Sequence, residues 1–184
     1  VLTYLAFIQR HDSNPNVPYA LFMVAKAHYA MAPDDLFFMP PIEELDLSSV
    51  QQARNHLERF IKQYPKSRYV TEAVQMRDHC LDLQWAHLRY VVGFYAKREK
   101  WMGVAFRLHQ AFQQFPVRAQ TLDNYALLAT AYDKLAWRTR AVELWLAIGK
   151  RWPETPEGQR AAAEVARLQA DIAEAKRQIG RAHV

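Results

Sequence analysis

The chain has 184 residues, of which 51% are hydrophobic and only five are glycine, so a disordered chain is excluded and one sizeable helical domain is favoured. The net charge of +5 is mild and favours acidic partners or anionic surfaces in a general way. The basic residues are scattered rather than gathered among aromatic residues, which argues against a nucleic-acid-binding protein. The single cysteine, Cys80, excludes an internal disulfide, and no apolar run is long enough to cross a bilayer.

One pattern recurs along the chain: an apolar helical stripe, then an aromatic residue, then a proline. A repeat period of about 34 residues is typical of tetratricopeptide arrays, which bind other proteins and seldom catalyse reactions. The sequence therefore predicts an all-α, tetratricopeptide-like α-solenoid of stacked antiparallel helix hairpins with a C-terminal capping helix. The pattern occurs at residues 60–65, 112–116 and 148–153, with a degenerate copy at 7–11.

The first predicted element, residues 1–12, is the end of a preceding hairpin. The chain opens in the middle of an amphipathic pattern, so we expect earlier repeats to be missing from it. The next hairpin, residues 17–64, has a first helix near residues 18–31 and a second helix from Ser48. Ser48 followed by Gln51 three residues later is typical of a capping box.

An inserted loop at residues 32–47 separates these two helices. Three prolines and an acidic run predict a loop, yet its centre is unusually apolar for one. The apolar side chains either fold back over neighbouring helices or form an exposed anchor for a partner, because contiguous exposed apolar patches are uncommon on monomers. These candidate partner-binding residues are Phe37, Phe38 and Met39.

Residues 67–115 are predicted to form a long helix and the rest of the fourth hairpin. The stretch from Ser67 to Arg98 contains no proline and carries a continuous apolar stripe, which predicts one helix. A break near Leu83-Gln84 is the alternative, because periodicity alone does not exclude it.

The fifth hairpin, residues 119–152, has the best-formed pattern. Small residues at 129 and 141 allow its two helices to approach closely, and large residues at 132 and 145 fill the space between turns. A capping helix is predicted over residues 156–179, with Thr155 as its N-cap, and residues 180–184 form a tail. The single solenoid is expected to cover residues 1–179.

These features together resemble the BamD family of outer-membrane β-barrel assembly lipoproteins, also described as competence lipoproteins. The resemblance spans residues 7–176, and it depends on the insertion, the long helix after Tyr69 and a set of local motifs. These motifs are Asn16-Val17-Pro18-Tyr19-Ala20-Leu21, Gln52-Ala53-Arg54, Tyr64-Pro65-Lys66-Ser67-Arg68-Tyr69, and Phe94-Tyr95 through Arg98 and Trp101 to Arg107.

The resemblance implies a noncatalytic scaffold at the periplasmic face of the bacterial outer membrane. Its implied partners are the POTRA domains of the barrel-assembly protein, accessory lipoproteins and unfolded outer-membrane proteins. Membrane attachment is implied only through an N-terminal lipid that this chain does not contain. Basic residues of the family align with Arg98 and Arg107, and a guanidinium presents a planar fork to a partner carboxylate. The alternative role for both residues is that of an ordinary exposed arginine, or of one paired within its own array.

The sequence predicts no enzyme, no cofactor and no metal site. It contains no metal-binding histidine motif, no glycine-rich phosphate loop and no serine in a nucleophile elbow. The acidic pairs Asp34-Asp35 and Glu43-Glu44 are predicted to be solvated loop charges. Two other classes stay open: another periplasmic tetratricopeptide adaptor in cell-envelope coordination, and an enzyme with an embedded repeat region.

Overall fold

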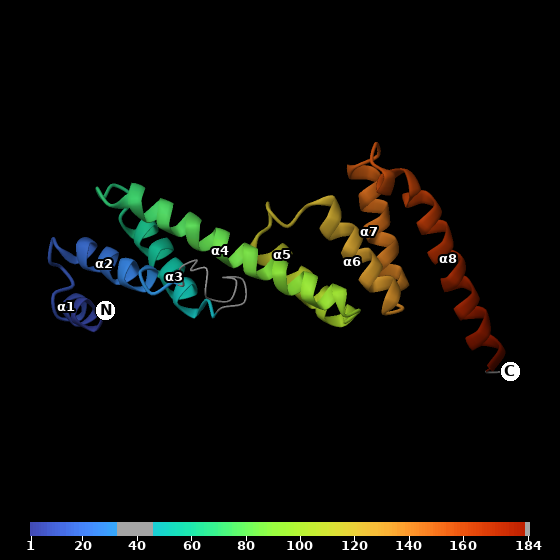
Figure 1. The fold of residues 1–184 in the computed structure, drawn as a ribbon, viewed down its shortest axis with the longest axis horizontal. Coiled ribbons are helices and arrows are strands. Elements are labelled where there is room, and N and C mark those ends of the chain that lie inside the picture. Colours follow the sequence, from blue (N-terminus) through green and yellow to red (C-terminus); the bar gives the residue numbers. More distant parts are fainter. Residues whose placement is uncertain (33–45, 183–184) are drawn as a thin grey trace. The chain divides into compact units, whose positions relative to one another are not determined.

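The computed structural model describes residues 1–32 and 46–182, and this part of the chain is built from helices without strands. The all-α, tetratricopeptide-like class is therefore confirmed (Figure 1). The helices are α1 (Leu2–Arg10), α2 (Val17–Tyr29), α3 (Ser48–Gln63), α4 (Val70–Lys97), α5 (Trp101–Gln114), α6 (Leu122–Lys134), α7 (Arg138–Arg151) and α8 (Pro156–Ala182).

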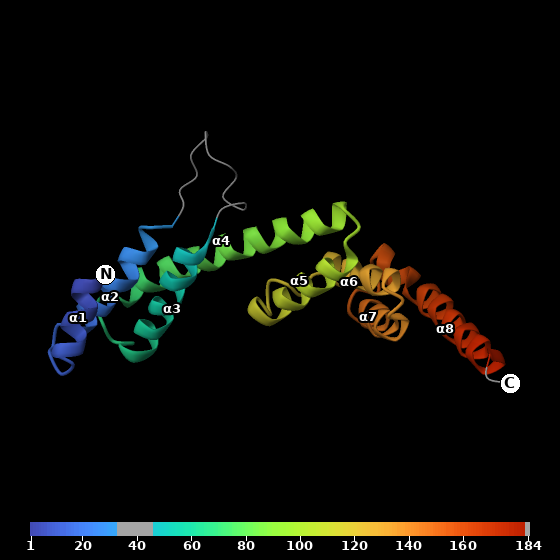
Figure 2. The same ribbon diagram turned by 90° about the horizontal axis from the view of Figure 1, so that it is seen from below.

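The chain divides into two compact units, Val1–Tyr90 and Val91–Val184, called unit 1 and unit 2 below. The core of unit 1 joins α2, α3 and the first half of α4, and both views show α2 and α3 side by side (Figures 1 and 2). Cys80 is fully buried in this core and packs as a small apolar side chain. The largest fully buried side chains of the unit 1 core are Phe22, Leu57 and Phe60.

The core of unit 2 joins the end of α4 to α5, α6, α7 and α8. Ala129 and Ala141 are fully buried where α6 meets α7, and the large side chains of Tyr132 and Trp145 are buried beside them, as predicted. Helix α8 is held by ion pairs as well as apolar packing. Arg167 on α8 contacts Asp133 at the end of α6 at 2.6 Å. Arg167 also pairs with Asp171, one turn further along α8, at 3.3 Å.

The recurrent aromatic–proline pairs mark one repeated backbone turn. A proline disfavours the α conformation at the residue before it, so each aromatic residue is the C-cap at which its helix stops. That residue still donates its N–H to the carbonyl four positions earlier, at 2.8–2.9 Å in all three copies. The φ and ψ angles are −129° and 58° at Tyr64, −132° and 60° at Phe115, −132° and 56° at Trp152, and −138° and 52° at the degenerate copy, His11.

A second repeated turn joins α4 to α5 and α6 to α7. Glu99 and Ala136 adopt positive φ angles of 53° and 58°. The next residue donates its N–H five positions back, from Lys100 to Tyr95 and from Trp137 to Tyr132. These are Schellman motifs, which usually carry glycine at the left-handed position. Because neither copy uses glycine, the sequence pattern did not reveal them.

One predicted cap and one predicted helix end were wrong. No capping box forms at Ser48, because Asp46 accepts hydrogen bonds from both the backbone N–H and the hydroxyl of Ser48. Helix α8 continues through Ala182, beyond the predicted end at residue 179, since a terminal glycine, Gly180, costs a helix only about 1 kcal/mol. The Thr155 cap is confirmed, with its hydroxyl accepting from the Gly158 N–H at 3.1 Å.

Helix α4 is one continuous helix of 28 residues, and the alternative break near Leu83-Gln84 does not occur. The single solenoid over residues 1–179 stays a prediction, because the two units are separate compact bodies. None of the helices in the described ranges combines the length and hydropathy that a membrane span requires.

Candidate protein-interaction surfaces

The first candidate surface lies in unit 2 at the turn between α4 and α5. We call it the α4–α5 surface and define it by Phe94, Arg98, Met102, Phe106 and Arg107. Phe94 and Arg98 lie one helical turn apart at the end of α4, and Met102 and Phe106 lie one turn apart on α5. The three apolar side chains are 40%, 55% and 65% exposed in chain order. Such exposure of large apolar groups beside cations is typical of binding surfaces.

The turn places Arg98 in solvent, and its guanidinium folds back over the last turn of α4. The guanidinium carbon lies 3.6 Å from the centre of the Phe94 ring, and Nη1 donates to the Phe94 carbonyl at 3.3 Å. Arg98 therefore has an internal role, because it satisfies a terminal helix carbonyl and covers an exposed aromatic ring.

Arg107 is half-buried on α5, next to the exposed Phe106. Its Nη1 donates to Gln110 at 2.9 Å, which is a contact within its own helix. A neutral amide leaves the positive charge of the guanidinium uncompensated by this contact. Of the two predicted arginines, Arg107 is thus the better placed to receive a partner carboxylate.

The predicted apolar anchor Phe37, Phe38 and Met39 lies outside the described residues. Its two alternatives, packing over the helices or anchoring a partner, stay predictions. The apolar members of the α4–α5 surface were not singled out from the sequence. Helical periodicity could have revealed them, because Met102 and Phe106 lie off the apolar stripe of α5 that carries the buried Val104 and Leu108.

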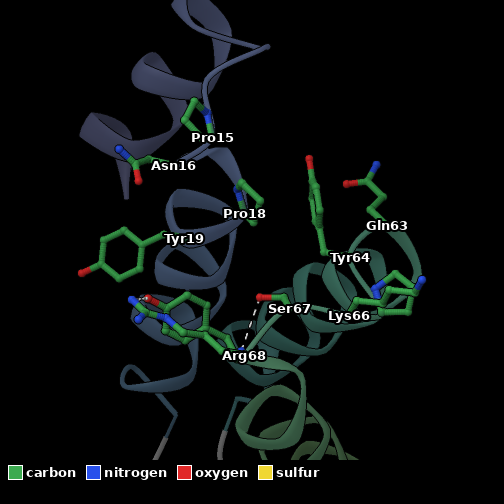
Figure 3. Close-up of a pocket in the computed structure, with 11 residues that line it drawn as sticks. Pro15, Asn16, Pro18, Tyr19, Gln63, Tyr64, Lys66, Ser67 and Arg68 are labelled. Carbon is green, nitrogen blue, oxygen red and sulfur yellow. Dashed lines mark hydrogen bonds between the residues drawn. The ribbon is translucent and has the colours of Figure 1, made fainter.

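A second candidate surface is a cleft of 580 Å³ in unit 1, lined by Pro15, Asn16, Pro18 and Tyr19 and by residues 63–69. Figure 3 shows Pro18 and Tyr19 on one side and Tyr64 and Lys66 on the other, with Arg68 below. The cleft therefore lies between the start of α2 and the turn from α3 to α4. The phenol of Tyr4 raises the pKa of Tyr19 above its ordinary value.

A third hollow, of 420 Å³, lies in unit 2 between α5, α6 and α7. Arg140 and Glu143 both contribute to its lining, so it has no single charge preference. His109 and Tyr132 close one part of it by a direct side-chain contact.

The titratable groups within residues 1–32 and 46–178 form no recognisable catalytic or metal-binding arrangement. Burial raises the pKa of the Cys80 thiol to about 11, so the reactive thiolate is scarce. No group of three or more His, Cys, Asp or Glu side chains in the described part of the chain could hold a metal ion.

The family model for YfiO, an outer membrane lipoprotein, matches residues 1–144 of this chain. The chain belongs to the YfiO outer membrane lipoprotein family. The resemblance that the sequence motifs indicated is confirmed at this level. The matched region includes all of unit 1 and the whole α4–α5 surface.

Curated members of this family carry the name outer membrane protein assembly factor BamD. The Haemophilus influenzae protein is 25% identical over 132 residues, covering 71% of this chain and 50% of the relative. The Pasteurella multocida protein is 26% identical over 132 residues, covering 70% and 50%. The protein of Neisseria meningitidis serogroup A is 22% identical over 161 residues, covering 83% and 59%. The chain spans about half the length of the first two relatives.

Proposed function

We propose that this chain is part of a noncatalytic scaffold that assembles β-barrel proteins into the bacterial outer membrane. Membership of the YfiO family and the names of the BamD relatives support this role. Helical repeats suit it, because stacked hairpins present extended surfaces to several partners at once. The scaffold would act at the periplasmic face of the membrane, held by an N-terminal lipid.

The α4–α5 surface is the proposed docking site for the POTRA domains of the barrel-assembly protein. The observation that carries this assignment is the adjacency on α5 of a 65% exposed Phe106 and the Arg107 guanidinium, whose carbon lies 5.7 Å from the centre of the Phe106 ring. Aromatic and arginine side chains supply most of the binding energy at protein interfaces. Phe106 would bury its ring against the partner, and the Arg107 guanidinium would donate two parallel hydrogen bonds to a partner carboxylate.

Arg98 has a supporting role in this docking. Its stacking on Phe94 fixes both side chains at the edge of the turn, so less rotamer entropy is lost on binding. Accessory lipoproteins and unfolded barrel segments would bind elsewhere on the full-length protein, including the region of Phe37, Phe38 and Met39.

Calorimetric titration of the chain with the isolated POTRA region tests the docking site. Arg107→Glu should weaken binding by about tenfold or more, because charge reversal replaces an attraction with a repulsion. Phe106→Ala should weaken it by a similar factor. Neither change should lower the melting temperature, since Phe106 is exposed and the Arg107 hydrogen bond is local.

Arg177→Glu is the matched control, because Arg177 is an exposed arginine of the same unit on α8. It makes the same change in net charge and should bind like the unaltered chain. Equal affinities for Arg107→Glu and Arg177→Glu would remove Arg107 from the site. A pull-down that recovers the intact chain in a complex without the barrel-assembly protein would support the cell-envelope adaptor instead.

A further inference from the structure

The cleft of unit 1 is separate from the α4–α5 surface, and the docking proposed above does not use it. Three tyrosines, Tyr19, Tyr64 and Tyr69, line the cleft. Figure 3 shows Tyr19 and Tyr64 on opposite sides of it. The Tyr19 and Tyr69 ring centres are 5.6 Å apart. Tyr19 is 41% exposed, and Tyr64 and Tyr69 are half-buried, so each tyrosine is open to a ligand in part.

Both sides of the cleft rest on the core. Tyr69 stacks on Phe22 with ring centres 4.9 Å apart and planes inclined by 10°. Tyr64 packs against Phe60 at 5.9 Å, and the two phenylalanines contact each other at 5.7 Å. Phe22 and Phe60 are at most 2% exposed. The tyrosines are therefore held in place before any ligand arrives, which lowers the entropy cost of binding.

The charged side chains that line the cleft are positive. None of the 11 residues that line it in the described part of the chain is acidic, and Lys66 and Arg68 are both basic and exposed. Arg68 donates to the Tyr69 hydroxyl at 2.5 Å, which orients its guanidinium along the tyrosine side. The carboxylate of Glu72, at the start of α4, forms an ion pair with the ammonium group of Lys26 at 2.7 Å. The cleft is thus electropositive and attracts an anion.

We propose that this cleft binds an extended acidic segment of a partner protein. The backbone of the segment would lie between Tyr19 and Tyr64, with its carboxylates against Lys66 and Arg68. Tyrosine-lined grooves suit extended and proline-containing peptides, whose preformed backbone loses little entropy on docking. Its volume of 580 Å³ matches that of clefts that enclose a few side chains.

A fluorescein-labelled peptide of repeated Asp-Pro-Glu-Pro units is the test probe, with an Asn-Pro-Gln-Pro peptide as its neutral counterpart. Fluorescence anisotropy with the full chain should show binding of the acidic peptide and at least about tenfold weaker binding of the neutral one. Binding of the acidic peptide should weaken as salt screens the attraction. Equal binding of both peptides would overturn the proposal.

The double variant Lys66→Glu, Arg68→Glu should lose at least about tenfold in affinity for the acidic peptide. Its matched control is Lys134→Glu, Lys150→Glu, which changes the net charge equally at exposed positions of unit 2 and should bind normally. If both double variants lose affinity equally, the attraction is one of overall charge and the cleft is not the site.

Tyr19→Ala removes one side of the cleft without altering charge, and it should also weaken peptide binding. Its thermal melt confirms folding, which is expected because Tyr19 is 41% exposed.

Vesicles containing phosphatidylglycerol provide the competing outcome. Sedimentation with these vesicles that is lost in Lys66→Glu, Arg68→Glu, without binding of the acidic peptide, would overturn the proposal in favour of a lipid surface. POTRA docking would stand in either case, because its residues lie in unit 2.

Discussion

A single added methyl group should have opposite effects at two glycines of unit 2. Gly158 lies in the first turn of α8, where a Cβ atom would come within 1.9 Å of the Trp152 carbonyl oxygen and 2.7 Å of its carbon. Both atoms belong to the backbone, so no side chain can rotate away. Gly93 lies within α4, and a Cβ atom there would meet nothing within 4 Å.

The two magnitudes follow from these distances. Gly93→Ala should raise the free energy of unfolding by about 0.5–1 kcal/mol, since alanine is the better helix former and no contact opposes it. Gly158→Ala gains part of the same propensity but must displace the Trp152 turn. Overpacking of this kind costs roughly 1–3 kcal/mol, so the variant should be destabilised overall.

Urea unfolding followed by tryptophan fluorescence measures both effects, because four of the five tryptophans belong to unit 2. The midpoint should rise for Gly93→Ala and fall for Gly158→Ala, with an unchanged slope. A Gly158→Ala variant as stable as the unaltered chain would mean that α8 does not approach the Trp152 turn so closely. The packing of the capping helix described above would then be wrong.

Three further predictions concern stability. Trp145→Ala should cost about 3–5 kcal/mol in urea unfolding, because the ring is 95% buried in the core of unit 2; a loss below about 1 kcal/mol would contradict the repeat register. Ala136→Gly should stabilise the chain by about 0.5–1 kcal/mol in the same assay, since glycine relieves the positive φ angle. Burial, followed by the nearby His28, lowers the pKa of His56. The stabilisation of the folded state by neutral His56 is present above pH about 6.5, and it is lost as the pH falls through the lowered pKa. Thermal melts of His56→Gln should therefore show a smaller fall in stability on acidification than those of the unaltered chain.

The positions of most helices could be predicted from the sequence because their signals are local. A proline restricts the residue before it, so each aromatic–proline pair ends a helix whatever surrounds it. The apolar stripe of α4, uninterrupted by proline, likewise predicted one long helix. The start of α3 at Ser48 was predicted correctly, but the capping box was not, because Ser48 donates its N–H and hydroxyl to Asp46.

The candidate surfaces were only partly predictable. Arg98 and Arg107 could be singled out by resemblance and placed at the turn and on α5 from periodicity. Their contacts could not be predicted, because the stacking of Arg98 on Phe94 depends on side-chain rotamers. The exposure of Phe106 was also missed, since a phenylalanine in a helix is buried more often than exposed.

By itself, the sequence determined the helical repeat, the family and the places where hairpins end, because proline restrictions and helical periodicity act over a few residues. Only the tertiary structure decided where a glycine is indispensable and where a binding cleft exists. The Trp152 carbonyl excludes a side chain at Gly158 only after α8 has packed. Tyr19 and Tyr64 face one cleft only because Phe22 and Phe60, far apart in the chain, meet in the same core.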